Sequence, residues 1–185
     1  MSATTTTDLL LTWQFDAKDM RKAELWIPPP EGSTERLKLY YFATYDRIST
    51  YYRWNLLTGR YENAGTIEWT SPWNIMLNLG MREARIDTMA RRNKPTSKSR
   101  RFKAPNDIDY KWRPVQSNPA DLECMTVSGK KPVAYYNASN NTLNVAPRGQ
   151  PILDDLVVLN LVHLYRRLQG VDFVIPTVTA STSAG

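Results

Sequence analysis

The sequence predicts a mainly β fold, a sandwich or a barrel, whose strands surround one hydrophobic helix near the C-terminus. Three observations predict it. The 185-residue chain contains ten Tyr, six Trp and four Phe but only eight Gly, and aromatic side chains favour the pleated, half-buried surface of a strand. Short runs of β-forming residues recur between turn residues. The hydrophobic pattern changes to that of a helix once, over residues 152–168.

The length and composition predict one domain, over residues 8–179. At 42% hydrophobic composition the chain can bury one sizeable core, since domains commonly contain about 100–200 residues. Residues 1–7 and 180–185 show no hydrophobic period, so we expect disordered tails at both ends. The single cysteine, Cys124, excludes an internal disulfide framework and a multi-cysteine zinc site. The fold must therefore depend on packing.

Turn residues separate the expected strands. The run Pro28–Pro30 must interrupt any strand, because proline removes a donor from the hydrogen-bond ladder. Thr58-Gly59 and Ser128-Gly129 are typical of hairpin turns, where glycine permits positive φ. In chain order, the expected strands are Leu9–Phe15, Ala23–Ile27, Leu37–Tyr45, Thr50–Leu57, Thr66–Thr70, Trp73–Leu79, Ala84–Met89, Arg100–Ala104, Tyr110–Val115, Leu122–Val127, Val133–Asn137, Thr142–Ala146 and, after the helix, Val171–Thr179.

The helix is expected over Ile152–Leu168, and the residues at its ends agree with this assignment. Proline suits a first turn, acidic residues suit the positive end of the helix dipole, basic residues suit the negative end, and glycine can terminate a helix. The residues that supply these signals are Pro151, Asp154, Asp155, Arg166, Arg167 and Gly170.

This helix is expected inside the protein. Eleven of the seventeen residues are apolar and cover most of its circumference, a pattern typical of a helix surrounded by protein. A membrane span is the alternative, but a span needs about 20 predominantly apolar residues. The segment also contains Asn160 and His163. A core helix is therefore the better interpretation.

Many short strands followed by one apolar helix, together with several short motifs, resemble the tubby C-terminal superfamily, which includes the phospholipid scramblases. The motifs are Tyr52–Trp54, Gly65–Trp69, Ser99–Lys103, Asp109–Arg113 and Asp154–Val158. Across Leu9–Leu168 the chain is more closely similar to a fungal family of uncharacterised domains placed in that superfamily. The resemblance implies an antiparallel, barrel-like sheet of about 12 strands around that central helix, and this is the fold that we expect. It also implies a tendency toward lipid- or membrane-associated roles, and it supplies no catalytic residues.

The densest charge lies in residues 91–103, which contain seven cations and no acidic residue. Arginine and lysine at this density can hold phosphates through charge-assisted hydrogen bonds. We expect this segment to bind anionic phospholipid or phosphoinositide headgroups; a solvated loop that only keeps the protein soluble is the alternative without a function. The seven candidates are Arg91, Arg92, Lys94, Lys98, Arg100, Arg101 and Lys103.

The net charge of +6 and pI of about 9.5 favour acidic partners of several kinds. We expect a non-catalytic binding module that needs no cofactor or metal, located in the cytoplasm or peripherally at a membrane, because the N-terminal residues lack the pattern of a secretory signal. A protein-interaction or assembly module that uses aromatic surface is the second hypothesis, and a nucleic-acid-binding protein is the third. The aromatic candidates are Tyr40, Tyr41, Tyr45, Tyr51, Tyr52 and Trp54, of which at least half should face the core.

No motif identifies an enzyme active site, although a site assembled from distant strands leaves no local trace. His163 is the only histidine, and it lies in the apolar helix. We therefore expect it to be a core residue with a polar partner, rather than a catalytic base that activates Cys124.

Overall fold

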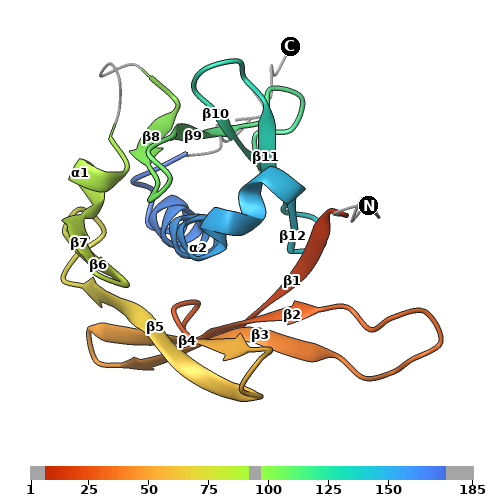
Figure 1. The fold of residues 1–185 in the computed structure, drawn as a ribbon. Helices are drawn as coiled ribbons and strands as arrows, with labels where there is room; N and C mark the ends of the chain where they lie inside the picture. The colour runs from red at the N-terminus through yellow and green to blue at the C-terminus, as the bar shows by residue number, and fades with distance from the viewer. Residues whose placement is uncertain (1–6, 92–96, 174–185) are drawn as a thin grey trace, which may run out of the picture.

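The computed structural model describes residues 7–91 and 97–173, and within these ranges 12 strands form one antiparallel sheet (Figure 1). The strands lie in the order β7-β6-β5-β4-β3-β2-β1-β12-β11-β10-β9-β8. Their bounds are β1 (Leu9–Phe15), β2 (Ala23–Ile27), β3 (Leu37–Tyr45), β4 (Ile48–Asn55), β5 (Arg60–Trp69), β6 (Ile75–Leu79), β7 (Arg82–Arg85), β8 (Arg100–Lys103), β9 (Asp109–Pro114), β10 (Leu122–Thr126), β11 (Pro132–Asn137) and β12 (Thr142–Val145).

The sheet curls around the helix without closing. Strands β1 to β7 form one meander and β8 to β12 form another, and the pairing of β1 with β12 joins them. This arrangement leaves β7 and β8 as the two edges of the sheet, which we call the seam. The mainly β fold with one C-terminal helix is confirmed, whereas "barrel-like" describes only the curvature of the sheet.

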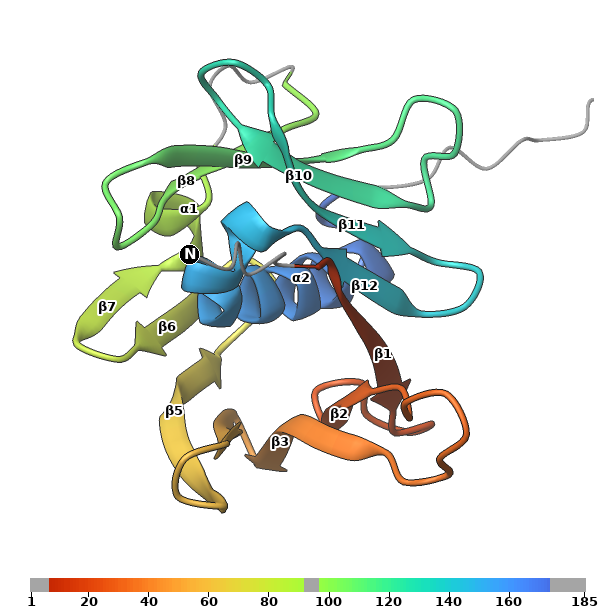
Figure 2. The same cartoon turned by 45° about the vertical axis from the view of Figure 1, so that its right-hand side comes forward.

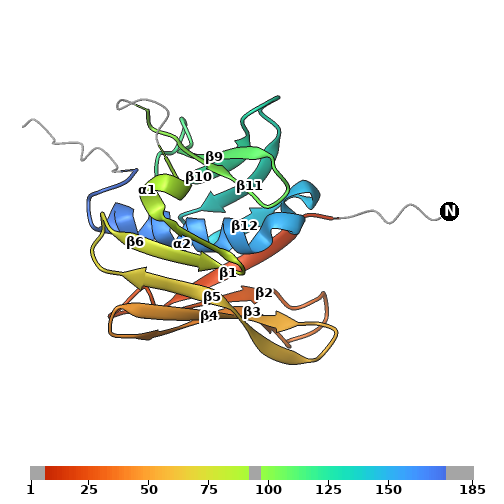
Figure 3. The same cartoon turned by 60° about the vertical axis from the view of Figure 1, so that its left-hand side comes forward.

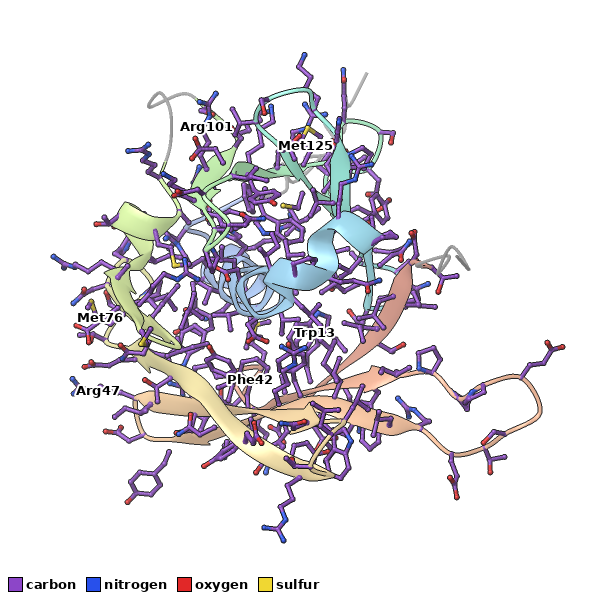
Figure 4. All side chains as sticks on the ribbon, viewed as in Figure 1. Trp13, Phe42, Arg47, Met76, Arg101 and Met125 are labelled. Atoms are coloured by element: carbon purple, nitrogen blue, oxygen red, sulfur yellow. The ribbon has the colours of Figure 1, made fainter. Side chains whose placement is uncertain are left out.

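Helix α2 (Leu153–Leu168) lies in the centre of the curled sheet (Figures 1 and 2). None of its residues from Leu156 to Leu164 is more than 8% exposed. The buried amide of Asn160 is partly satisfied by Trp13, whose indole Nε1 donates to Asn160 Oδ1 at 2.9 Å. Figure 4 shows Trp13 on the helix-facing side of the sheet. The prediction of a core helix is confirmed, and none of the helices in the described ranges is long and apolar enough to cross a membrane.

The first turn of α2 is attached to the strands through its acidic residues. Asp154 accepts hydrogen bonds from Tyr40 of β3 and from Arg53 of β4. Asp155 accepts one from Arg82 of β7 at 2.6 Å. Neither carboxylate caps the helix, which is preceded by a 3-10 helix, η1 (Pro147–Ile152), that contains Pro151. These contacts attach the N-terminal end of α2 to strands of the β1–β7 meander, of which β2 to β5 lie below the helix in Figure 3.

Two expected strands were wrong in part. The segment Ala84–Met89 is split, because β7 ends at Arg85 and the short helix α1 (Ile86–Met89) follows. β7 has no strand beyond it to pair with, and the change of direction lets Ile86 enter the core, where it is 0% exposed.

The strand expected over Val171–Thr179 is not formed by its described residues, 171–173. Asp172 turns into the protein and is 1% exposed, and Phe173 adopts a left-handed backbone with φ of 47°. The other residues of that expected strand, and most of the two expected tails, lie outside the described residues.

Gly65 provides a test of the sheet geometry, because it has a φ of 153° and a Cβ at this position would lie 2.0 Å from the backbone oxygen of Asn78. We expect Gly65→Ala to lower the free energy of unfolding by about 2–4 kcal/mol, through backbone strain and overpacking. Gly59→Ala is the matched control: its φ of 62° is also positive, but nothing lies within 4 Å of the added carbon. Gly59→Ala should lower the free energy of unfolding, measured with urea, by only about 1–2 kcal/mol. Equal costs would contradict the close approach of β5 to β6.

Candidate anion-binding surface

The seam between β7 and β8 contains a groove of about 580 Å³. Helix α1 lies beside it, and Arg82 crosses it by donating from Nη1 to the backbone oxygen of Lys103 at 3.4 Å. Four cations and two carboxylates line the groove, so its charge is predominantly positive. They are Arg82, Arg91, Arg101 and Lys103, with Glu83 and Asp109.

Strand pairing places three cations side by side across this surface. Arg91 forms an isolated antiparallel bridge with Arg101, in which each backbone N–H donates to the other residue's oxygen. Arg101 is in turn directly opposite Lys111 in the β8–β9 register. Figure 4 shows Arg101 on β8, away from α2. We call Arg91, Arg101 and Lys111 the cationic row.

The cationic row carries positive charge that the described residues do not neutralise. None of its three side chains forms a salt bridge there, and Arg101 Nε is buried without a hydrogen-bond partner. Like charges directly opposite each other on a sheet are destabilising. Burial lowers the pKa of the Lys111 ammonium, and the nearby cations Arg113, Lys130 and Arg101 lower it further, whereas Glu123 opposes the shift. A bound anion would relieve this repulsion.

Other cations near the row have partners. Lys103 pairs with Asp107 at 2.9 Å, although both side chains are well exposed. Arg113 lies two residues beyond Lys111 on β9, and its Nε donates to Glu123 at 2.7 Å. The absence of such pairing within the described residues therefore distinguishes the cationic row from Lys103 and Arg113.

The seven candidates from residues 91–103 do not all lie on this surface. Arg91, Arg101 and Lys103 line the groove, and Lys98 is exposed nearby in sequence. Arg92 and Lys94 lie outside the described residues. Arg100 is 3% exposed and forms a buried ion pair with Asp172, which removes it from the headgroup-binding surface that we expected. Its inward position follows from strand alternation, since neighbouring side chains point to opposite faces.

Sequence reasoning missed Lys111 and Arg82. The alternation Asp109-Tyr-Lys-Trp-Arg113 does indicate that Lys111 faces outward, because Tyr110 and Trp112 are buried. Its pairing with Arg101 depends on the register between two segments, which no local pattern provides. Arg82 reaches the groove only because the sheet remains open between β7 and β8.

The buried side of β8 holds a separate, internal charge cluster. Asp172 pairs with Arg100, lies 3.9 Å from Arg166 Nε, and contacts His163 Nδ1 at 3.0 Å. Phe173 covers the cluster, with its ring 4.9 Å from that of His163. All the charged side chains here are at most 4% exposed. The interpretation of His163 as a core residue with a polar partner is confirmed.

The single histidine makes the stability of this cluster measurable. Burial lowers the pKa of His163 from its ordinary value of 6.5, although Asp172 opposes the shift. The folded state then binds fewer protons than the unfolded state. The contribution of His163 to the free energy of unfolding is therefore fully present above about pH 6.5 and is lost as the pH drops toward the folded pKa. We expect urea unfolding free energies to fall by up to about 1.4 kcal/mol per pH unit in this window. The variant His163→Gln should remove that dependence; an unchanged pH slope in the variant would contradict the assignment.

The remaining chemical candidates offer no accessible reactive group. Cys124 is 1% exposed, and burial raises the pKa of its thiol well above the ordinary value, which keeps it unreactive. Across residues 7–91 and 97–173, no three His, Cys, Asp or Glu side chains converge in a way that could hold a metal ion.

The aromatic residues divide between the two faces of the sheet. Tyr40 and Tyr51 are fully buried. Tyr41 and Tyr52 are partly exposed on the other face, where their rings stack at 4.7 Å, and Tyr45 is 88% exposed at the end of β3. The stacked rings contact each other and lie on β3 and β4, whereas Arg101 and Lys111 of the cationic row lie on β8 and β9.

Comparison with known proteins gives a family without an assigned activity. A protein-family model described as a family of unknown function (DUF6593) matches residues 12–175. Neither the curated proteins nor the solved structures contain a significant match. The matched range begins within β1 and includes the other eleven strands, α1, η1 and α2.

Proposed function

The chain belongs to the family of unknown function DUF6593, and we propose that it is a non-catalytic module that binds the phosphate groups of anionic phospholipid headgroups through the cationic row. The observation that supports this proposal most strongly is the direct opposition of Arg101 and Lys111, neither of which forms a salt bridge within the described residues. Such an arrangement costs folding free energy unless an anion occupies it.

The spacing of the cationic row suits phosphate. Neighbouring strands lie about 4.8 Å apart, so adjacent side chains of the row can both reach one phosphate group. Arginine can do so with two parallel hydrogen bonds, and each charged bond is stronger than a neutral one. The full row spans roughly 10 Å, enough for a headgroup that carries more than one phosphate.

The surroundings support a membrane location for the ligand. Arg82 and Lys103 add two more basic groups along the groove, although each already pairs with a carboxylate, Asp155 and Asp107 respectively. Basic residues near an anionic membrane surface contribute about 1 kcal/mol each to binding. We therefore propose a cytoplasmic protein that is peripheral at an anionic membrane. We also propose kinship with the tubby C-terminal superfamily, because twelve strands surround a central helix.

The alternatives have less support. A single-stranded nucleic acid is held by basic groups with aromatic stacking platforms beside them, but the stacked pair Tyr41 and Tyr52 lies on strands remote from the row in the sheet order. A protein-interaction module that uses this aromatic face is the second candidate. Competition by an oligonucleotide in the vesicle co-sedimentation assay described below separates nucleic-acid binding from lipid binding.

Vesicle co-sedimentation tests the proposal. Wild-type protein should bind phosphatidylcholine vesicles that contain phosphatidylinositol bisphosphate and should leave pure phosphatidylcholine vesicles unbound. We expect Arg101→Gln combined with Lys111→Gln to weaken binding roughly thirtyfold, since two contacts of about 1 kcal/mol each are lost.

The control removes the same amount of charge from outside the row: Arg113→Gln, whose side chain pairs with Glu123, combined with Lys131→Gln on the exposed β10–β11 turn. It should weaken binding no more than about threefold, through net charge alone. Equal losses in both variants, or equal binding of the two vesicle types by the wild type, would show the proposal to be wrong. Calorimetric titration with soluble inositol trisphosphate then separates recognition of the free headgroup from a requirement for the membrane.

A further inference from the structure

Three hairpin turns expose large apolar side chains that the fold does not need. The β4–β5 turn carries Leu56 and Leu57, which are 75% and 96% exposed. The β6–β7 turn carries Met81, at 104%, and the β8–β9 turn carries Ile108, at 41%. We call these four residues the apolar tips.

The apolar tips lie at one end of the domain, where α2 begins. Leu56 and Leu57 line a hollow that also includes Asp154 of the first helical turn. Met81 lines a second hollow with Pro105 of the β8–β9 turn and the same first turn of α2. The two hollows share Arg53, Ala64 and Asp154, so they adjoin each other across the mouth of the sheet.

The turns do not require these apolar side chains. In the β4–β5 turn, Asn55 Oδ1 accepts hydrogen bonds from the backbone N–H of Leu57 and of Thr58, at 2.8 and 3.3 Å, and Gly59 supplies a positive φ of 62°. In the β6–β7 turn, Gly80 supplies a φ of 61°. The side chains of Leu57 and Met81 are solvent-exposed and could be polar without loss of packing. Their apolar character therefore needs an explanation outside the fold.

The apolar tips are continuous with the proposed phosphate site. Met81 lines the seam groove together with Arg82, Arg101 and Lys103. Lys103 is the next outward position after Arg101 on β8, toward the β8–β9 turn that carries Ile108. Positive charge and protruding apolar side chains thus meet at one end of the domain.

We propose that this end of the domain enters the membrane, with the apolar tips inserted at the boundary between headgroups and acyl chains while the cationic row binds the phosphates above it. The proposal rests on the proposed function. Separate hairpins with protruding side chains suit a fluid layer that closes around each of them, whereas a protein partner needs a packed, complementary surface. Apolar insertion and electrostatic attraction together give the two signals that stable peripheral binding requires.

Site-specific fluorescence tests the insertion. Leu57→Cys and Met81→Cys are each labelled with an environment-sensitive dye, since the native Cys124 is only 1% exposed and should not react. Ile48→Cys is the matched control, because Ile48 is also apolar and 49% exposed. It lies next to the β3–β4 turn, at the opposite end of β4 from Leu56 and Leu57, where β4 pairs with the part of β5 that precedes the β5–β6 turn. With phosphatidylcholine vesicles containing phosphatidylinositol bisphosphate, the dyes at the tips should shift to shorter wavelength and the control dye should not.

Substitution separates this inference from the proposed function. The triple variant Leu56→Ser, Leu57→Ser and Met81→Ser should bind the same vesicles at least tenfold more weakly, because each buried apolar side chain favours insertion. It should bind soluble inositol trisphosphate as the wild type does.

If the tip dyes do not shift while wild-type protein still sediments with the vesicles, the insertion is wrong and headgroup binding stands. A shift that appears without vesicles as the protein concentration rises would mean that the tips contact a second copy of the chain, and would also overturn the insertion. Loss of both vesicle and trisphosphate binding in the wild type would instead disprove the proposed function.

Discussion

The enclosure of α2 by the curled sheet is the constraint on which the rest of the structure depends. The helix is apolar on nearly all sides, so no single surface could bury it, and strands from both meanders must surround it. Each fully buried Leu or Val contributes about 1.5–3 kcal/mol of gross stabilisation. Asp154 and Asp155 then fix its first turn against β3, β4 and β7, so the position of the helix also sets the positions of the strands beside the seam.

The open seam carries the surface that we propose to bind anions. A closed sheet would pair β7 with β8 directly, whereas here the two edges remain separate and Arg82 crosses between them. Strand alternation sends Arg100 inward to Asp172 and Arg101 outward beside Lys111. The same four-residue strand therefore supports the internal charge cluster on one face and the cationic row on the other. Stability and the proposed anion binding therefore both depend on its register.

The sequence predicted most of the fold because its signals are local. The bounds of β1, β2 and β3 agree with the expected ones, since alternating apolar residues and turn residues define them. The first half of β5, from Arg60 to Ala64, was missed, because it is polar and becomes a strand only by pairing with β4. The site was predicted less well for the same reason: the density of charge at residues 91–103 was visible, but the burial of Arg100 and the pairing of Arg101 with Lys111 depend on register and on contacts distant in sequence.

The measurement that tests the central claim most directly is a titration of isotope-labelled protein with soluble inositol trisphosphate, followed by the chemical shifts of the backbone amides and of the arginine and lysine side chains. If the cationic row holds phosphate, the largest shifts should occur at Arg91, Arg101 and Lys111. The Lys111 ammonium should also become more basic, because a bound anion offsets the burial and the repulsion that lower its pKa. Shifts confined to the aromatic face of β3 and β4, with the row unchanged, would contradict the account.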